Sequence, residues 1–446
     1  MIKKLNLKKL LLLITIIIGA IGITQHASAS AFQLWEQDAI SVGNYHSGRV
    51  ALANDASVAF YNPAGMVRIK NQEVVLAGIA VLTDIKYRGI VAVNTFHANA
   101  PQTVTSQGGG FNFIPNLHYV SPLNDTWDFG FSIAVPFASQ VSYGRPTVLR
   151  YASTLAQTQV VDISPSLGYK LNEKLSLGVG LDIQKMSAQF DQVGVLGTNS
   201  DTNSTNKGFD TAYGCHFGLL YQFNSNTRAG LSYNSQVVHH LRGSSQFVGP
   251  IATLYNGAPI VTTAAHVNLT LPPYTTLSLF RNINPQWSVM GTLSYTQWTT
   301  IRNIVMQGLA GIAPGGIGKA STNLVVIIPQ YYRNTWNISA GADYAVNDKF
   351  TFRSGLGYDQ TPTNNSYRNV QMPDSNRYAV AFGGHYQATK TVSFDLGWTH
   401  LFLQGSGETG NINPPVQQTG AEKVTTRGSV DSSADVFGAQ VTWDML

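Results

Sequence analysis

From about residue 73 onward, apolar and polar residues alternate with a period of two, the pattern of β-strands with one apolar and one polar face. In segment 175–184, one face carries Leu175, Leu177, Val179, Leu181 and Ile183. The opposite face carries Ser176, Gly178, Gly180, Asp182 and Gln184. The alternation recurs in segments 287–296, 350–359 and 391–399. We therefore predict many strands that separate an apolar medium from a polar one.

Two kinds of connection join these predicted strands. Segments 171–174, 223–226, 282–286 and 346–349 are short and polar, whereas 191–208, 244–266, 303–328 and 404–433 are long. Transmembrane barrels have this asymmetry, with short periplasmic turns and long extracellular loops. Segment 303–328 is unusual because it carries apolar residues in a position predicted to be wet. It either attracts a greasy ligand or folds over its neighbours.

The composition indicates which apolar medium the strands face. Only 11% of residues are charged while 43% are apolar, and ordinary soluble domains carry about 25% charged residues. After Ile23 no apolar run approaches the roughly 20 residues of a membrane-spanning helix. Helices and closed barrels are the structures that satisfy every backbone group in lipid. A soluble β-sandwich also alternates, but not over roughly 370 residues with so little charge. The chain is thus predicted to be an all-β, antiparallel transmembrane β-barrel.

The first 29 residues read as a cleavable export signal, with the apolar core Leu10–Ile23 and the cleavage pattern Ala27-Ser28-Ala29. The positive region before the core consists of Lys3, Lys4, Lys8 and Lys9. Export and a barrel together predict the outer membrane of a Gram-negative cell. Because the chain has 28 basic and 23 acidic residues, loss of these lysines leaves it almost neutral. The charge therefore gives no support for nucleic-acid binding.

Segment 30–72 lacks strand alternation and is rich in Gly, Ala, Asn and Ser. An irregular backbone cannot face lipid, so this segment is expected in the periplasm or inside the barrel. Pro63 favours an extended or turn conformation at Asn62. The first strand is predicted to begin near Glu73.

Catalytic chemistry finds little support in the sequence. We see no Gly-x-Ser-x-Gly element for a lipid hydrolase, no phosphate-binding loop and no Cys/His cluster with metal-ligand spacing. Cys215 is the single cysteine, so no internal disulfide can form. We expect no catalytic residue, no metal and no cofactor.

Several separate motifs, in order along nearly the whole chain, resemble those of one family. They are Ala31-Phe32-Gln33-Leu34, Gly43–Gly48, Asn62-Pro63-Ala64, Phe113–Val120, Asn284-Pro285-Gln286-Trp287, Gly341–Tyr344, Arg353-Ser354-Gly355 and Pro373–Arg377. With these motifs the chain resembles the FadL family of outer-membrane transporters for long-chain fatty acids and related hydrophobic compounds.

The resemblance implies a barrel of about 14 strands (73–446) plugged by an N-terminal hatch (30–72) that contains Asn62, Pro63 and Ala64. It also implies that substrate leaves sideways through a gap beside an inward strand kink, which here matches Phe113, Ile114, Pro115 and Asn116. Pro115 makes physical sense in that role because it deletes a ladder hydrogen bond. The alternative is a proline at a strand end.

Ligand contacts are also implied by the resemblance. Phe32 resembles the family's hatch phenylalanine and would reach a lumenal pocket. Arg353 and Arg377 fall on the polar, inward faces of their segments, where they could pair with a carboxylate. The alternative is that they form ion pairs with Asp343, Asp359 or Asp395, because charges held away from bulk water usually pair with each other.

We expect energy-independent uptake of long-chain fatty acids or similar hydrophobic molecules. The partners would be these molecules together with outer-membrane lipid and lipopolysaccharide, and the protein would be a monomer. Two alternatives stay open. One is an uptake channel for aromatic hydrocarbons, and the other is a surface adhesin or receptor whose barrel only displays loops.

Overall fold

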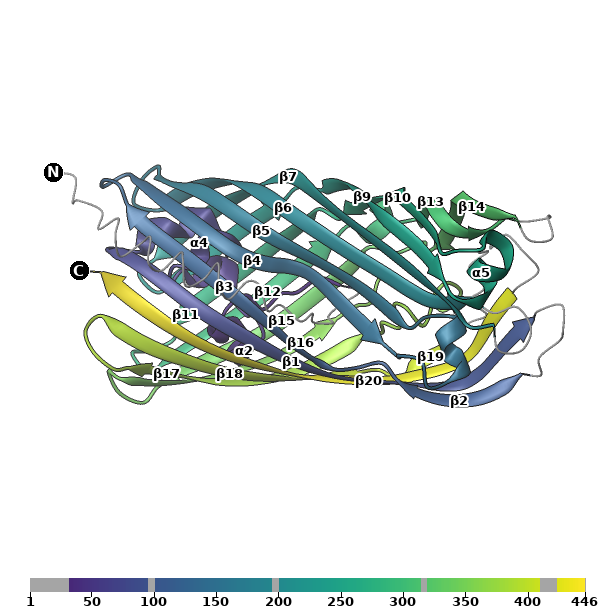
Figure 1. The fold of residues 1–446 in the computed structure, drawn as a ribbon. Coiled ribbons are helices and arrows are strands. Elements are labelled where there is room, and N and C mark those ends of the chain that lie inside the picture. The colour runs from purple at the N-terminus through teal and green to yellow at the C-terminus, as the bar shows by residue number, and fades with distance from the viewer. Residues whose placement is uncertain (1–31, 95–100, 195–199, 314–318, 410–422, 446) are drawn as a thin grey trace.

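The computed structural model describes residues 32–94, 101–194, 200–313, 319–409 and 423–445. In this part of the chain, nearly all regular structure is antiparallel β-sheet closed into a barrel, as Figure 1 shows. No helix within these ranges is long and apolar enough to cross a membrane. The signal segment predicted for residues 1–29 lies outside the described residues.

The barrel wall contains 14 strands over the described ranges, which confirms the predicted fold class. Ten are uninterrupted: β1 (Gln72–Asn94), β3 (Phe111–Pro122), β4 (Trp127–Ser142), β5 (Leu155–Lys170), β6 (Leu175–Gly194), β7 (Thr202–Asn224), β16 (Phe350–Asp359), β17 (Arg377–Gln387), β18 (Val392–Leu403) and β20 (Lys423–Met445). The others are each built from two pieces: β8 (Thr227–Asn234) with β9 (Val237–Val248), β11 (Tyr274–Asn282) with β10 (Ile260–Leu271), β12 (Trp287–Thr296) with β13 (Asn303–Ile312), and β15 (Thr335–Ala345) with β14 (Ala320–Pro329).

The barrel closes where the first wall strand meets the last. β1 and β20 pair without interruption from Gln72↔Met445 to Asn94↔Lys423. At their far ends the short strands β2 (Gln102–Gln107) and β19 (Ser406–Thr409) pair with β1 and β20 respectively. Two 3-10 turns, η2 (Val148–Tyr151) and η3 (Trp298–Thr300), lie in connections.

Alternation along the strands separates the two faces of the wall. In β16, Phe352 and Leu356 are 63% and 61% exposed, whereas Arg353 between them is buried. Large apolar side chains therefore cover the outer surface, and polar side chains point inward. This is the arrangement that the sequence pattern predicts for a barrel in lipid.

A hatch of short helices fills one end of the lumen. Its elements are α2 (Ala39–Asn44), α3 (Arg49–Leu52), α4 (Val58–Tyr61) and η1 (Pro63–Arg68). α2 contacts β16, β17, β18 and β20, whereas η1 contacts β4 to β7 and α3 contacts β8 and β11. Because these strands lie around the barrel, the hatch is enclosed by the wall at the end where β20 finishes, as Figure 1 shows.

One prediction about the connections is wrong: segment 303–328 is not a wet loop. It forms the hairpin β13–β14, with Asn303 paired to Pro329 and Ile304 to Ile328. Met306 and Leu309 are buried against neighbouring strands. Register shifts on either side of Leu309, next to Gly308 in the left-handed region (φ 68°), interrupt the alternation that would have revealed the strand. The segment thus folds over its neighbours.

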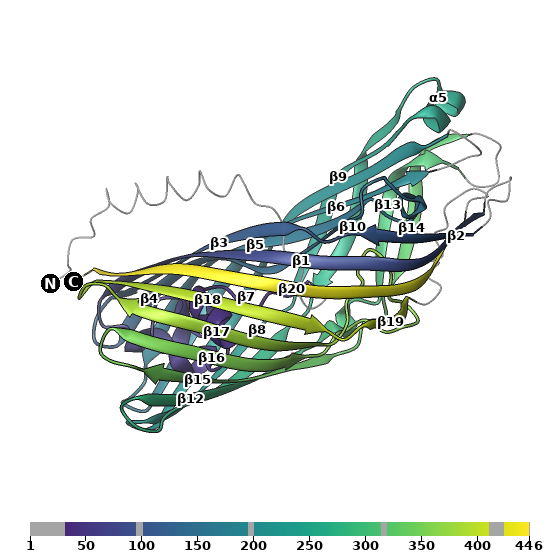
Figure 2. The same cartoon turned by 90° about the horizontal axis from the view of Figure 1, so that it is seen from below.

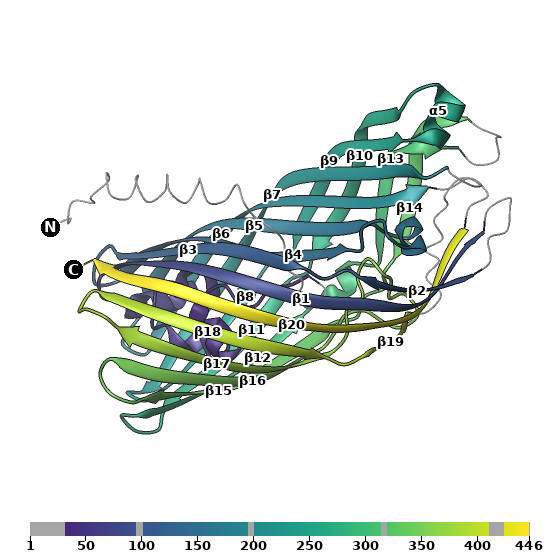
Figure 3. The ribbon, with the colours of Figure 1, turned by 60° about the horizontal axis from the view of Figure 1, so that its bottom comes forward.

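The other long connections are also shorter than predicted because the strands continue beyond the bilayer-sized core. Segment 191–208 is mostly the β6–β7 ladder, which runs to Gly194↔Thr202. β9 and β10 lean outward from the rest of the wall and carry α5 (Pro250–Asn256) at their tip, with β13 and β14 beside them, as Figures 2 and 3 show. The connection between β16 and β17, residues 360–376, instead turns inward and buries Arg368, Asn369 and Val370.

Candidate functional site

The lumen beyond the hatch contains a mostly apolar cavity whose empty space, including the part open to solvent, is about 580 Å³. Strands β5, β6, β9, β10 and β13 supply one side, and the inward connection 360–376 supplies the other. The lining residues are Phe32, Thr158, Met186, Ala188, Phe190, Leu241, Val267, Leu269, Ile301, Ile304, Gln330, Tyr332, Asn369, Gln371 and Met372. A concave apolar site with a few polar groups is the usual form of a small-molecule site.

Phe32 lies at the hatch end of this cavity. It is only 4% exposed, and its ring meets Trp298 edge-on at 5.1 Å and Phe137 at 5.6 Å between centroids. Such tilted and edge-to-face pairs are favourable aromatic geometries. The structure therefore places Phe32 in the wall of this cavity.

The tail that carries Phe32 is hydrogen-bonded to β4. Leu34 N–H donates to the carbonyl of Pro136 (2.8 Å), and Ala138 N–H donates to the carbonyl of Phe32 (2.7 Å). Gln33 and Phe137 form the β-bridge between them. The tail thus occupies the edge of β4 as a short antiparallel strand.

Gln37 extends this pairing with its side chain. Its Nε2 donates to the carbonyl of Val135 (3.0 Å), and its Oε1 accepts from Val135 N–H (2.9 Å). The side-chain amide therefore replaces a strand residue on both hydrogen bonds. Sequence reasoning missed Gln37, and no periodic signal marks a single polar residue in an irregular segment.

The edge of β4 is free for the tail because β3 leaves it. β3 pairs with β1 from Leu82↔Phe111 to Glu73↔Val120, but its pairing with β4 stops at Leu117↔Ile133. The part of β3 with no β4 partner among the described pairs contains Phe113, Ile114, Pro115 and Asn116. The wall is therefore interrupted between β3 and β4 at the level of the tail.

Pro115 lies inside β3, opposite Gly78 of β1, and not at the end of the strand. Proline is tolerated at a strand edge because its missing N–H has no partner to lose. Ile114 and Asn116 are buried on the inner face, whereas Phe113 is 41% exposed on the outer face. This segment thus presents one face to the lumen and the other to the outer surface.

The Asn62-Pro63-Ala64 motif fastens the hatch to the wall. Asn62 Oδ1 accepts from Ala64 N–H (3.1 Å) and caps η1. Its Nδ2 donates to the carbonyls of Val50 in the hatch (2.7 Å) and Leu219 in β7 (3.1 Å). A β-carbon on Gly218 would collide with Asn62 Oδ1. The motif therefore docks where the wall presents bare backbone.

A buried charge cluster holds the centre of the hatch together. The Arg49 guanidinium pairs with Asp38 and, at 3.4 Å, with Asp55. Asp55 Oδ2 also accepts from Gln440 Nε2 of β20 (3.0 Å), which links the hatch to the last strand. Burial alone would raise the pKa of Asp55, but the Arg49 guanidinium and hydrogen bonds from two neighbouring side chains hold that pKa below its ordinary value. The cluster is thus ionised and internally paired.

Arg353 is buried inside the barrel at the level of the hatch. Its guanidinium pairs with Asp395 of β18, and its Nε lies 3.6 Å from Asp343 Oδ2 of β15. Both carboxylates point inward, one from β15 beside β16 and the other from β18 two strands away. The structure therefore gives Arg353 two wall partners and does not place it in the lining of the apolar cavity.

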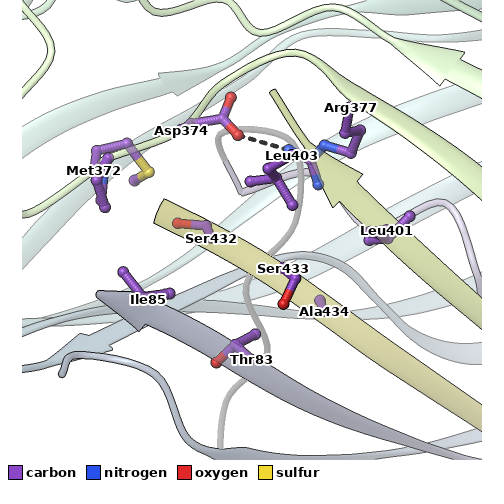
Figure 4. Close-up of a pocket in the computed structure, with 11 residues that line it drawn as sticks. Thr83, Ile85, Met372, Asp374, Arg377, Leu401, Leu403, Ser432, Ser433 and Ala434 are labelled. Carbon is purple, nitrogen blue, oxygen red and sulfur yellow. Dashed lines mark hydrogen bonds and ion pairs between the residues drawn. The ribbon is translucent and has the colours of Figure 1, made fainter. Parts of the chain in front are cut away.

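Arg377 lies beside a second, smaller cavity of about 410 Å³, shown in Figure 4. Its Nη2 donates to Asp374 Oδ1 (2.7 Å), and its Nε lies 3.9 Å from Asp359 Oδ2. Leu401 and Leu403 also line this space. Met372 lines both cavities, so the inward connection separates them. The two predicted arginines are not brought together.

Several functional candidates escaped the sequence analysis because distant segments assemble them. Trp298 carries the signal of an aromatic at a strand end, but its contact with Phe32 is tertiary. Met372 and Asn369 lie in a connection without periodicity. Among the described residues, no group of three or more His, Cys, Asp or Glu side chains could hold a metal ion.

A closed barrel, a lumenal hatch and an apolar cavity beside an interrupted wall define a plugged outer-membrane barrel. The chain belongs to the family described as outer membrane protein transport protein (OMPP1/FadL/TodX), whose model matches residues 20–445. It is thus an outer-membrane protein of a transport family.

Individual relatives resemble the chain over most of its length. The long-chain fatty acid transport protein of Salmonella typhi is 24% identical over 413 residues, covering 86% of this chain and 89% of the relative. Outer membrane protein P1 of Haemophilus influenzae is 26% identical over 414 residues, covering 84% and 86% respectively.

Solved structures show the same fold. A FadL homologue of Pseudomonas aeruginosa has a TM-score of 0.80 and 24% identity, covering 93% of this chain and 99% of its own. The toluene transporter TodX of Pseudomonas putida has a TM-score of 0.67 and 18% identity, covering 92% and 99%. The fold assignment thus rests on matches along the entire barrel.

Proposed function

We propose that the chain takes up long-chain fatty acids or similar hydrophobic molecules across the outer membrane by energy-independent diffusion, without catalysis. The observation that carries this proposal is the apolar cavity lined by Phe32, whose backbone pairs with β4 where β3 leaves that strand. The printed names of the curated relatives support a fatty-acid substrate. The partners are the hydrophobic ligand and, around a monomeric barrel, outer-membrane lipid and lipopolysaccharide.

The route follows from the cost of wetting an acyl chain. Each methylene moved from an apolar site into water costs about 0.8 kcal/mol. A ligand held in the cavity therefore leaves most readily through the wall, past Phe113, Ile114, Pro115 and Asn116, into the membrane. The hatch, held by Asn62, Pro63 and Ala64, keeps the direct path into the periplasm shut.

Roles of the remaining segments follow from this route. Residues 1–29 serve as the cleaved export signal, 30–72 as the hatch and 73–446 as the barrel. Phe32 contacts the ligand and moves with the tail when the β4 edge is vacated. Arg353 and Arg377 keep their lumenal ion pairs, so we assign them to the wall structure and not to the ligand head group.

Uptake of a labelled long-chain fatty acid, in cells that lack their own transporter, tests the proposal. We expect uptake by the intact protein and its loss when residues 62–64 are deleted, provided that both forms reach the outer membrane in equal amounts. An inserted intact barrel that takes up no fatty acid would refute the fatty-acid substrate.

A second candidate is uptake of aromatic hydrocarbons. The aromatic side chains of Phe32, Phe190 and Tyr332 in the cavity lining favour it. In the same cells, labelled toluene accumulation faster than fatty-acid accumulation would select this substrate. Uptake of neither compound would turn attention to a surface adhesin or receptor.

A further inference from the structure

The apolar cavity offers no counter-charge to an anionic ligand. Of the described residues that line it, none is Arg, Lys, Asp or Glu, and the polar members are Thr158, Gln330, Asn369, Gln371 and the hydroxyl of Tyr332. An ionised carboxylate buried without a partner is strongly disfavoured. The lining therefore suits an uncharged ligand.

The two inward arginines do not supply the missing charge. Arg353 lies between Asp395 and Asp343, and Arg377 lies between Asp374 and Asp359. A carboxylate ligand would have to displace a wall carboxylate and leave it buried and unpaired. This exchange is unfavourable because removing one partner of a buried ion pair strands the other.

Asn369 is the cavity residue with an unused polar atom. The side chain belongs to a residue that is 4% exposed, and its Nδ2 is buried without a hydrogen-bond partner. Its Oδ1 accepts from the backbone N–H groups of Gln371 (3.1 Å) and Met372 (2.9 Å). Two donors at one end fix the orientation of the amide, so the free end is the NH₂ group.

We propose that Asn369 Nδ2 is the head-group donor of this cavity. The cavity then selects long-chain compounds with an uncharged, hydrogen-bond-accepting head, such as an ester or the un-ionised acid, over the ionised carboxylate. This specificity rests on the proposed uptake function and names the form of the ligand that the site takes. A bound ester carbonyl would satisfy a donor that is otherwise buried and unpaired.

Fluorescence quenching by dibrominated ligands measures the specificity directly. The probes are dibromostearate, its methyl ester and dibromo-octadecane, added to the intact protein in lipid nanodiscs at about pH 8, well above the ordinary pKa of a carboxyl. Trp298 touches Phe32 in the cavity wall. Subtracting the fluorescence quenching of the Trp298→Phe protein from that of the natural protein gives the quenching of Trp298 alone.

We expect the ester to bind about threefold to tenfold more tightly than the hydrocarbon, the value of one hydrogen bond. The carboxylate should bind at least about tenfold more weakly than the ester. A carboxylate that binds as tightly as the ester would overturn the inference, and so would an ester no better than the hydrocarbon.

Two variants test the role of Asn369 itself. Asn369→Asp keeps the oxygen that caps the backbone and replaces the donor with a second oxygen, and Asn369→Ala removes both the cap and the donor. Both should abolish the advantage of the ester over the hydrocarbon, measured as the ratio of the two affinities within each variant. Ser366→Ala, at an exposed position in the same connection, is the control and should behave like the natural protein.

The outcomes separate this inference from the proposed function. If none of the probes quenches Trp298 and cells take up no ligand, the uptake function fails. If uptake and hydrocarbon binding persist but the ester advantage survives in both Asn369 variants, only the assignment of Asn369 fails.

Discussion

At the scale of single residues, the hatch packs against wall positions that are occupied by glycine. Gly218 of β7 leaves room for Asn62 Oδ1, and Gly178 of β6 leaves room for the backbone at Ala64. Such close approach lets the Asn62 amide reach a wall carbonyl that a side chain would cover. The docking of the hatch against the wall is therefore sensitive to the addition of a single methyl group at one of these glycines.

We expect Gly218→Ala to loosen the hatch, because overpacking a fitted contact costs about 1–3 kcal/mol. Hydrogen exchange of the amides in α4 and η1 should accelerate, while exchange in the wall strands stays unchanged. Gly384→Ala in β17 is the control, since a β-carbon there meets no atom closer than 4.0 Å. Equal exchange in both variants would contradict this view of the contact.

Acid should release the hatch at a low pH. Because the folded pKa of Asp55 lies below its ordinary value, its ionised form stabilises the hatch above the unfolded pKa of about 4. This contribution is lost as the pH falls through the folded pKa. Hydrogen exchange of the hatch amides, corrected for the pH dependence of the intrinsic exchange rate, should stay constant from neutral pH to about pH 4 and rise below it.

The Asp55→Asn protein should lack this acid-dependent step and exchange faster already at neutral pH. Asp348→Asn, in an exposed turn, should keep the profile of the natural protein. A profile that does not differ between Asp55→Asn and the natural protein would show that other carboxyls control the hatch.

Alternation in the sequence predicted which face each wall residue occupies, but not its contacts. Arg353 and Arg377 are both inward, as predicted, yet the Asp374 partner comes from a connection without periodicity. Met290 broke the apolar-out pattern of its segment because it points inward against Asn44 and Gly48 of the hatch. An exception to a strand pattern was thus the visible sign of a contact that only the tertiary fold creates.

At the scale of elements, the break between β3 and β4 and the hatch tail form one unit. Where β3 departs, Phe32–Leu34 and the Gln37 amide take over the hydrogen bonds of β4. An unpaired strand edge is unfavourable inside a membrane. The tail therefore supplies the missing hydrogen bonds of β4 and, with Phe32, also lines the cavity. Clearing the break therefore requires the tail to leave β4, whereas closing it requires β3 to pair with β4 again.

A disulfide across the tail should test this coupling. Gln33 and Phe137 are directly paired, and paired antiparallel residues have Cα atoms about 4.5–5.5 Å apart, within the range of a disulfide. In a Cys215→Ser background, Gln33→Cys with Phe137→Cys should form the bond under oxidation and block fatty-acid uptake. Reduction should restore uptake in the same cells.

Each single-cysteine protein serves as a control for the loss of the natural side chain and should not respond to oxidant. Unchanged uptake with the bond fully formed would mean that the tail stays on β4 during transport. The ligand would then use another opening.

The element boundaries show where sequence reasoning ends. The short turns and the first strand were located to within about two residues, and β1 begins at Gln72, next to the predicted start near Glu73. The hairpin β13–β14 was missed because bulges beside Gly308 shift the side-chain period. The tail strand could not be foreseen at all, since its partner exists only where two other strands separate.

At the scale of the whole molecule, the proposed diffusion down a concentration gradient needs no energy source. Outer-membrane vesicles prepared with this protein, and without ATP or an ion gradient, should transfer a labelled fatty acid down its concentration gradient. The rate should exceed that of protein-free vesicles, and the tail disulfide should remove the excess. A transfer that begins only when ATP or a proton gradient is supplied would contradict diffusion.

The contacts between the hatch and the last strand, β20, also bear on the order in which the barrel assembles. Gln440 of β20 accepts a hydrogen bond from Ala39 N–H (3.1 Å) and donates one to Asp55 (3.0 Å), so residues made early rest on the strand made last. Contacts this distant along the chain are slow to form, because the long loop between them must first be closed. The contacts of the hatch with β20 therefore form only once the last strand is in place. Docking of the hatch onto β20 and closure of the barrel between β1 and β20 are therefore coupled steps of assembly.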